Sequence, residues 1–101
     1  MAQQILKAED VATALPGLPG WAVDGAALHK RFRFGGFAQA FGFMAACAVE
    51  AQAMTHHPDW ANVYARVDVK LTTHDAGGIT ANDLALARRM NALAAGFGLN
   101  P

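Results

Sequence analysis

Residues 37–55 constrain the fold of this chain more than any other segment. Gly35-Gly36 precedes them, Pro58 follows them, and the stretch between is typical of one long helix. Its apolar side chains form one stripe that a second set widens almost to the full circumference: Phe37, Phe41, Met44, Ala48 and Ala51, then Ala40, Phe43 and Cys47. A helix that is apolar on nearly every side must be covered from more than one direction. In a chain this short, a second subunit is the simplest second cover.

Length and composition predict one domain, residues 1–101, that associates with copies of itself. The mass of 10.6 kDa is that of a single domain. Hydrophobic residues make up 53% of the chain and charged residues only 16%, against about 25% charged in an average domain. The shortage of charge suggests that some surface is hidden, as it would be in a homodimer or homotetramer.

Charge and cysteine usage exclude several classes of partner. The net charge is zero and the pI is about 6.9, so no basic field attracts nucleic acid or a membrane surface. The apolar residues 35–49 are fewer than the roughly 20 that span a bilayer, and the first residues have no apolar core of signal-peptide length. The single cysteine, Cys47, fits a small core residue in a reducing compartment. We therefore expect a cytoplasmic protein.

The segments before the long helix predict a short helix and a β-hairpin. Residues 8–15 are typical of a helix, which Pro16-Gly17 stops. Residues 21–23 and 27–34 predict two strands around Asp24-Gly25, a dipeptide that favours a type I′ turn because both central residues take positive φ. The second strand alternates with period two, and its apolar side chains share one face: Leu28, Phe32 and Phe34.

The segments after the long helix predict a strand and a last helix. Residues 62–73 alternate apolar and polar side chains without a break, which predicts one long strand. After a glycine loop, Thr80 caps a helix with Asp83 three residues on, a variant of the capping box, and Gly98 is a natural stop. Helices and strands together indicate an α+β fold.

Three of the chain's four histidines lie where one element gives way to the next. His56 and His57 come between the long helix and the following strand, and His74 comes at the end of that strand. Such positions deliver side chains to the edge of a cleft. Because an imidazole has an unperturbed pKa of about 6.5, it can give or take a proton near neutrality.

The residues alone leave three interpretations of these histidines open. Each could be a helix cap or a surface residue, the set could bind zinc, or the set could transfer protons in an acid–base site. Zinc is the least supported, because adjacent histidines in extended backbone point to opposite faces. His56 and His57 therefore cannot easily share one ion, and no cysteine pair or His-x-His supports a metal site.

A wider set of residues resembles a known family. His56-His57-Pro58, followed by Tyr64, His74 and Asp83 at these intervals, is similar to the signature of the pterin-4a-carbinolamine dehydratases. The resemblance extends over residues 19–90, and three further runs carry it: Gly20-Trp21, residues 40–44 (Ala-Phe-Gly-Phe-Met) and residues 71–74 (Leu-Thr-Thr-His).

The resemblance implies a fold. Members of the family have a four-stranded antiparallel sheet with three helices packed on one face, in the order α-β-β-α-β-β-α. Their sheets join across a dimer or a tetramer. By this analogy residues 62–73 are two strands broken near Tyr64-Ala65-Arg66, a break that the alternation does not show.

The resemblance also implies an activity. Family members dehydrate 4a-hydroxytetrahydropterin to quinonoid dihydropterin and water, without a metal or cofactor, and so recycle the cofactor of aromatic amino acid hydroxylases. By position, His56 and His74 match the proton-transferring histidines, and His57 matches one that helps to hold the pterin. Asp83 matches the carboxylate that closes the motif, and its role as a helix cap is equally open. Trp21 matches an aromatic wall for the pterin, whereas the sequence alone favours a core residue at the end of a strand.

One residue departs from the family pattern. Gln52 stands where the family usually has a charged residue, four before His56, and should lie beside His56 and hydrogen-bond at the substrate site. A binding role is the alternative function, because relatives also act as dimerisation cofactors for transcription factors or as assembly factors. The three retained histidines favour the enzyme.

Overall fold

A computed structural model describes residues 4–98 as a layer of helices on a sheet. The order of elements confirms the predicted α-β-β-α-β-β-α pattern, with one short 3₁₀ turn, η1, after the first helix. The elements are α1 (Ala8–Ala14), η1 (Leu15–Gly17), β1 (Ala22–Asp24), β2 (Ala27–Arg33), α2 (Phe37–Met54), β3 (Asp59–Val63), β4 (Arg66–Leu71) and α3 (Ala81–Ala95).

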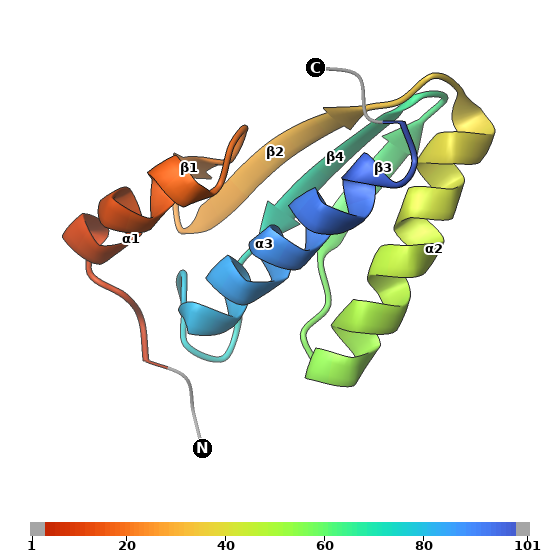
Figure 1. The fold of residues 1–101 in the computed structure, drawn as a ribbon. Helices are drawn as coiled ribbons and strands as arrows, with labels where there is room; N and C mark the ends of the chain where they lie inside the picture. Colours follow the sequence, from red (N-terminus) through yellow and green to blue (C-terminus); the bar gives the residue numbers. More distant parts are fainter. Residues whose placement is uncertain (1–3, 99–101) are drawn as a thin grey trace.

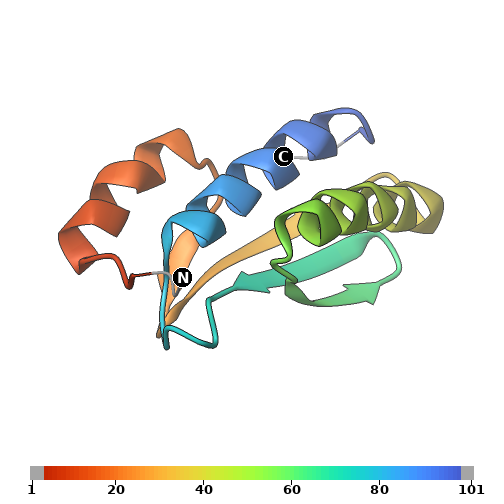
Figure 2. The same cartoon turned by 90° about the horizontal axis from the view of Figure 1, so that it is seen from below.

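The four strands form one antiparallel sheet in the order β1-β2-β4-β3. The central pair is β2 and β4, in a register that places Leu28 opposite Leu71 and Phe32 opposite Val67. The three helices cover one face of the sheet, as Figures 1 and 2 show from two directions. The fully buried side chains of the core, among them Phe32 and Leu71, lie between the two layers.

The first hairpin turns one residue later than predicted. Asp24 pairs with Ala27, so the two-residue loop is Gly25-Ala26 and not Asp24-Gly25. Of these two residues only Gly25 has a positive φ, of 60°. A positive φ at the first loop position alone is the pattern of a type II′ turn, in which glycine takes that position. The glycine was the informative residue, and the aspartate before it ends the strand.

The second hairpin shows that the prediction of one long strand over residues 62–73 was wrong. It confirms the two strands that the family resemblance implies. Val63 pairs with Arg66, and Tyr64-Ala65 forms the loop. Tyr64 has a φ of 50°, although no glycine is present. The Asn62 side-chain amide stabilises the turn by donating to the carbonyls of Tyr64 and Arg66, at 3.0 and 2.9 Å. A two-residue loop keeps the period of two, so the alternation runs through the turn unchanged.

The two apolar sets of α2 have different surroundings. The second set, Ala40, Phe43 and Cys47, is buried against the sheet together with Ala51 of the first stripe, and the Phe43 ring lies 4.7 Å from that of Phe32. Phe37 and Phe41 are 53% and 58% exposed, and Val49 is 71% exposed. A single copy of the chain therefore covers only one side of this helix.

The last helix packs beside α2 and ends earlier than predicted. The apolar face of α3 is buried in the core, through Leu84, Ala87, Met90 and Ala94. The helix stops at Ala95 with Gly96 as its C-cap, so Gly98 lies beyond the end. None of the helices within residues 4–98 has the length and hydropathy that crossing a bilayer requires.

Candidate active site

The three predicted histidines meet at one end of the sheet. Residues 55–57, which follow α2, and residues 72–75, which follow β4, line an open pocket of about 240 Å³. His56, His57 and His74 all belong to this lining. Side chains from two loops, 15 or more residues apart in sequence, thus face one space that is large enough for a small molecule.

The end of α2 separates the two adjacent histidines. Thr55 adopts a left-handed conformation with φ of 51°, and the next amide, of His56, donates to the Ala51 carbonyl at 3.0 Å. Beyond this cap residues 56–58 belong to no helix or strand, and Pro58 disfavours the helical conformation for His57, so the two histidine side chains are not held on one helix face. The His56 residue is buried, at 8% exposed, while His57 is exposed.

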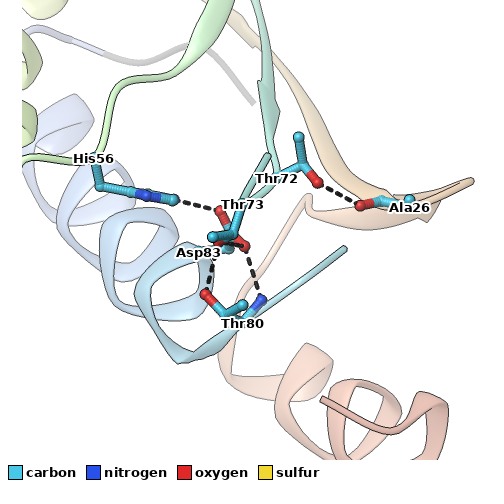
Figure 3. A network of polar contacts seen from close by, with 6 residues as sticks. All are labelled: Ala26, His56, Thr72, Thr73, Thr80 and Asp83. Carbon is cyan, nitrogen blue, oxygen red and sulfur yellow. Dashed lines mark hydrogen bonds and ion pairs between the residues drawn. The ribbon is translucent and has the colours of Figure 1, made fainter. Parts of the chain in front are cut away.

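His56 is paired with the predicted carboxylate of the motif, Asp83. Its Nε2 lies 2.5 Å from Asp83 Oδ1, and Asp83 is completely buried in the first turn of α3. The other carboxylate oxygen, Oδ2, accepts hydrogen bonds from the Thr73 hydroxyl at 2.9 Å and the Thr80 amide at 2.8 Å. Figure 3 shows these side chains converging from the end of α2, the end of β4 and the start of α3. Asp83 is therefore both a helix cap and the partner of His56.

Gln52 contacts His57 and not His56. The distance from its Oε1 to His57 Nε2 is 3.0 Å. The expected pairing with His56 assumed that the helix continues through residue 56, where residues four apart would be neighbours. Because α2 ends at Met54, His56 turns inward and His57 takes the position beside Gln52.

Two other predicted residues have different positions. His74 is exposed on the pocket lining, and no side chain within residues 4–98 hydrogen-bonds to its ring. Trp21 does not line the histidine pocket. It is 5% exposed, its ring meets that of Phe32 edge-on at 5.9 Å, and its Nε1 donates to Asn91. In this arrangement the indole belongs to the core. Its role as a wall for the pterin stays a prediction.

The arrangement suits proton transfer between groups at fixed positions. A buried carboxylate holds one imidazole, an amide holds a second, and a third is free to approach a ligand in the pocket. Among residues 4–98 no three histidine, cysteine or acidic side chains gather in a geometry that could hold a metal ion. The fourth histidine, His29, lies on the outer face of the sheet, 4.0 Å from Asp68.

Comparison with known proteins identifies the family. The sequence model of the family described as "Pterin 4 alpha carbinolamine dehydratase" matches residues 4–93. The chain belongs to this family. A provisionally named pterin-4-alpha-carbinolamine dehydratase from Solibacter usitatus is 50% identical over 91 residues, which cover 90% of this chain and 96% of the relative. One from Opitutus terrae, named in the same way, is 55% identical over 86 residues, 84% of this chain and 89% of the relative.

A solved structure in the dehydratase family has the same fold. The crystal structure of a transcriptional coactivator/pterin dehydratase from Brucella melitensis superposes with a TM-score of 0.87 at 46% identity. The match covers 90% of this chain and 99% of that one. It confirms the α+β fold expected from the resemblance.

Sequence reasoning missed Thr73 as part of this dehydratase-family pocket and gave Thr80 only the role of a cap. Thr73 follows Val67, Val69 and Leu71 on the inward face, so its hydroxyl is buried. A buried hydroxyl needs a hydrogen-bond partner, and that requirement was a readable signal. The identity of the partner depends on how α3 packs on the end of β4, which no local pattern reports.

Proposed function

We propose that this chain catalyses the dehydration of 4a-hydroxytetrahydropterin to quinonoid dihydropterin and water. The observation that carries the proposal is the convergence of His56, His57 and His74 on one pocket, with the first of them held by a buried carboxylate. Membership of the dehydratase family supports the substrate class. Positioned imidazoles are suited to a reaction that consists of proton transfers.

The reaction needs one base and one acid. A base removes the proton from N5 of the pterin, and the electron pair of that bond forms the N5=C4a double bond. The C4a–O bond breaks as an acid protonates the departing hydroxyl, which leaves as water. No oxidation or reduction takes place. We assign the two proton transfers to His56 and His74, and the orientation of the pterin to His57 with Gln52.

The chemistry of the substrate suggests its source. A 4a-hydroxytetrahydropterin forms when a tetrahydropterin-dependent monooxygenase transfers one oxygen atom to its own substrate. We therefore place this chain in tetrahydropterin recycling in the cytoplasm, beside an aromatic amino acid hydroxylase. Its assembly as a homodimer or homotetramer belongs to the same proposal.

The test is a comparison of histidine variants in a direct assay. Purified protein is mixed with freshly generated 4a-hydroxytetrahydropterin, and the absorbance change is compared with the rate without protein. His74→Ala is expected to lower kcat/KM about 10²–10⁴-fold, the usual contribution of a positioned acid or base. His29→Ala is the matched control, because His29 lies on the outer sheet face, and it should keep the wild-type rate.

Two outcomes would contradict the proposal. One is a wild-type rate no higher than the rate without protein. That result would favour a binding role, such as the coactivator role that the name of the Brucella melitensis protein includes. The other is loss of activity on treatment with a chelator and its return with zinc, since the three histidines are proposed to act without metal.

A further inference from the structure

The hydrogen bonds around Asp83 form a ring in which each of the two threonine hydroxyl hydrogens can be assigned to one acceptor. An ionised carboxylate can only accept, so the Thr73 hydroxyl must donate to Asp83 Oδ2. A hydroxyl has one hydrogen, so the contact of 2.7 Å between the Thr73 and Thr80 hydroxyls must be a donation from Thr80. The Thr80 hydroxyl oxygen remains free to accept from the Asp83 amide in the capping-box geometry, and that amide also donates to the Thr80 carbonyl at 3.1 Å.

This ring determines which carboxylate oxygen faces His56. Oδ2 already accepts from the Thr73 hydroxyl and the Thr80 amide, and these two donors leave no space for a proton on it. Oδ1 is thus left for His56, 2.5 Å from Nε2. Two lone pairs facing each other at that distance would repel, so a hydrogen lies between the atoms, and His56 Nε2 carries it.

The second ring nitrogen of His56 then becomes the one that can react. Nδ1 has no hydrogen-bond partner among residues 4–98. Within the same residues, the one buried side-chain nitrogen or oxygen without a hydrogen-bond partner is Arg66 Nε, so His56 Nδ1 is reached by solvent. His56 also lines the histidine pocket, so a ligand bound there lies beside this ring.

We propose that Thr73 is a positioning residue that fixes the tautomer of His56 through Asp83, so that Nδ1 is the atom that exchanges a proton with the ligand. The hydroxyl of Thr73 occupies Oδ2 and thereby directs Oδ1 at Nε2. The tautomer is a property of the protein alone. Only its consequence for the rate rests on the proposed dehydratase function.

The tautomer can be read without any substrate. In protein labelled with ¹⁵N at histidine, two-dimensional NMR distinguishes a ring nitrogen that carries hydrogen from one that does not. At a pH where His56 is neutral, wild-type protein should show a protonated Nε2 and a bare Nδ1. A protonated Nδ1 in neutral His56 would overturn the proposal.

Substitution at Thr73 separates positioning from general stability. Thr73→Val keeps the shape and removes the donor, so the Nδ1-protonated form of His56 should become populated. Thr73→Ser keeps the hydroxyl and should keep the wild-type tautomer. Thr13→Val is the matched control, since it removes one hydroxyl hydrogen bond, to the Glu9 carbonyl, on a helix away from the pocket. If Thr73→Val does not fold, Thr73→Ala gives the same test with a smaller side chain.

The rate of dehydration tests the consequence. Because the valine variant lets His56 populate the tautomer in which Nδ1 carries the hydrogen, Thr73→Val should lower kcat about 10- to 100-fold with little change in KM. Thr73→Ser should restore most of the rate. An unchanged tautomer in the folded valine or alanine variant would overturn the positioning role. A changed tautomer in a protein without dehydratase activity would uphold it and reject the proposed function.

Discussion

His56 and His57 are neighbours in the sequence and have different partners because the helix before them ends at Met54. That the two would point apart could be predicted, since extended backbone alternates. That His56 would meet Asp83 could not, because the two lie 27 residues apart and no local pattern reports long-range packing. The residue at which α2 ends thus decides which of the two histidines contacts Gln52.

Cys47 shows how burial decides the chemistry of one side chain. It is completely buried, and this burial, with the nearby Glu50 carboxylate, raises the pKa of its thiol to about 12. The thiolate is the reactive form, so Cys47 should be inert in the folded protein. We expect a disulfide reagent at pH 8 to label the native protein at least about a hundredfold more slowly than the protein in denaturant, because labelling requires opening. Equal rates would contradict the buried position.

The same thiol predicts an alkaline effect with a definite sign. Its pKa is higher in the folded protein than the ordinary value of 9.0, so the folded state retains a proton that the unfolded chain releases. The contribution of Cys47 to the free energy of unfolding is complete below pH 9.0 and declines as the pH rises toward about 12. The stability difference between wild type and Cys47→Ala, measured by urea denaturation, should narrow from pH 8 to pH 11.

At the scale of elements, glycine and proline residues made the ends of α2 predictable, whereas the turn of the second hairpin has neither and was not predicted from the residues alone. Gly35-Gly36 and Pro58 placed α2 to within one residue. The β3–β4 turn contains neither glycine nor proline, and its stabilising residue, Asn62, lies before the loop and reads as part of the strand. Only the resemblance to a family revealed that break.

The outer face of the sheet has a charge cluster centred on Asp68 of β4. Arg31 Nε lies 2.6 Å from Oδ1 and Arg66 Nε lies 3.1 Å from Oδ2. Burial alone would raise the pKa of the Asp68 carboxyl, but the hydrogen bond from Arg31 and the charges of Arg31, Arg66 and His29 outweigh it and lower the pKa. The carboxylate therefore joins the two central strands electrostatically.

This cluster predicts sensitivity to acid. A carboxyl with a lowered pKa stabilises the fold above its unfolded value, about 3.9, and loses that contribution as the pH falls through its folded value. Asp68→Asn should cost about 1 kcal/mol or less of unfolding free energy at pH 7, because the pairs are partly exposed, and less still at pH 2.5. Asp24→Asn is the control, since Asp24 has a more exposed pair with Lys70 at 3.4 Å. A difference between wild type and Asp68→Asn that is equal at both pH values would contradict this account.

At the scale of the whole molecule, one chain leaves an apolar helix face uncovered. The helices lie on one side of the sheet, and the outer face of α2 is directed away from it (Figure 2). Phe37 and Phe41 are exposed there with their rings 5.9 Å apart. The sequence predicted that α2 is packed against on more than one side, and within one chain only its sheet-facing side is buried.

We expect the second cover to be another copy of the chain packed on the outer face of α2. In light scattering at micromolar concentration, the wild-type mass should be that of a dimer or a tetramer of the 10.6 kDa chain. Phe41→Glu should reduce that mass, because a carboxylate buried in an apolar interface costs several kcal/mol. Since Phe41 is exposed in one copy, the substitution should change the stability of a single copy by only about 0.5 kcal/mol.

Val63→Glu, on the exposed edge strand β3, tests the competing possibility that the sheet edges join. A reduced mass in Val63→Glu with a wild-type mass in Phe41→Glu would assign the interface to the sheet edge. A wild-type mass near 10.6 kDa would mean that the face stays open to solvent.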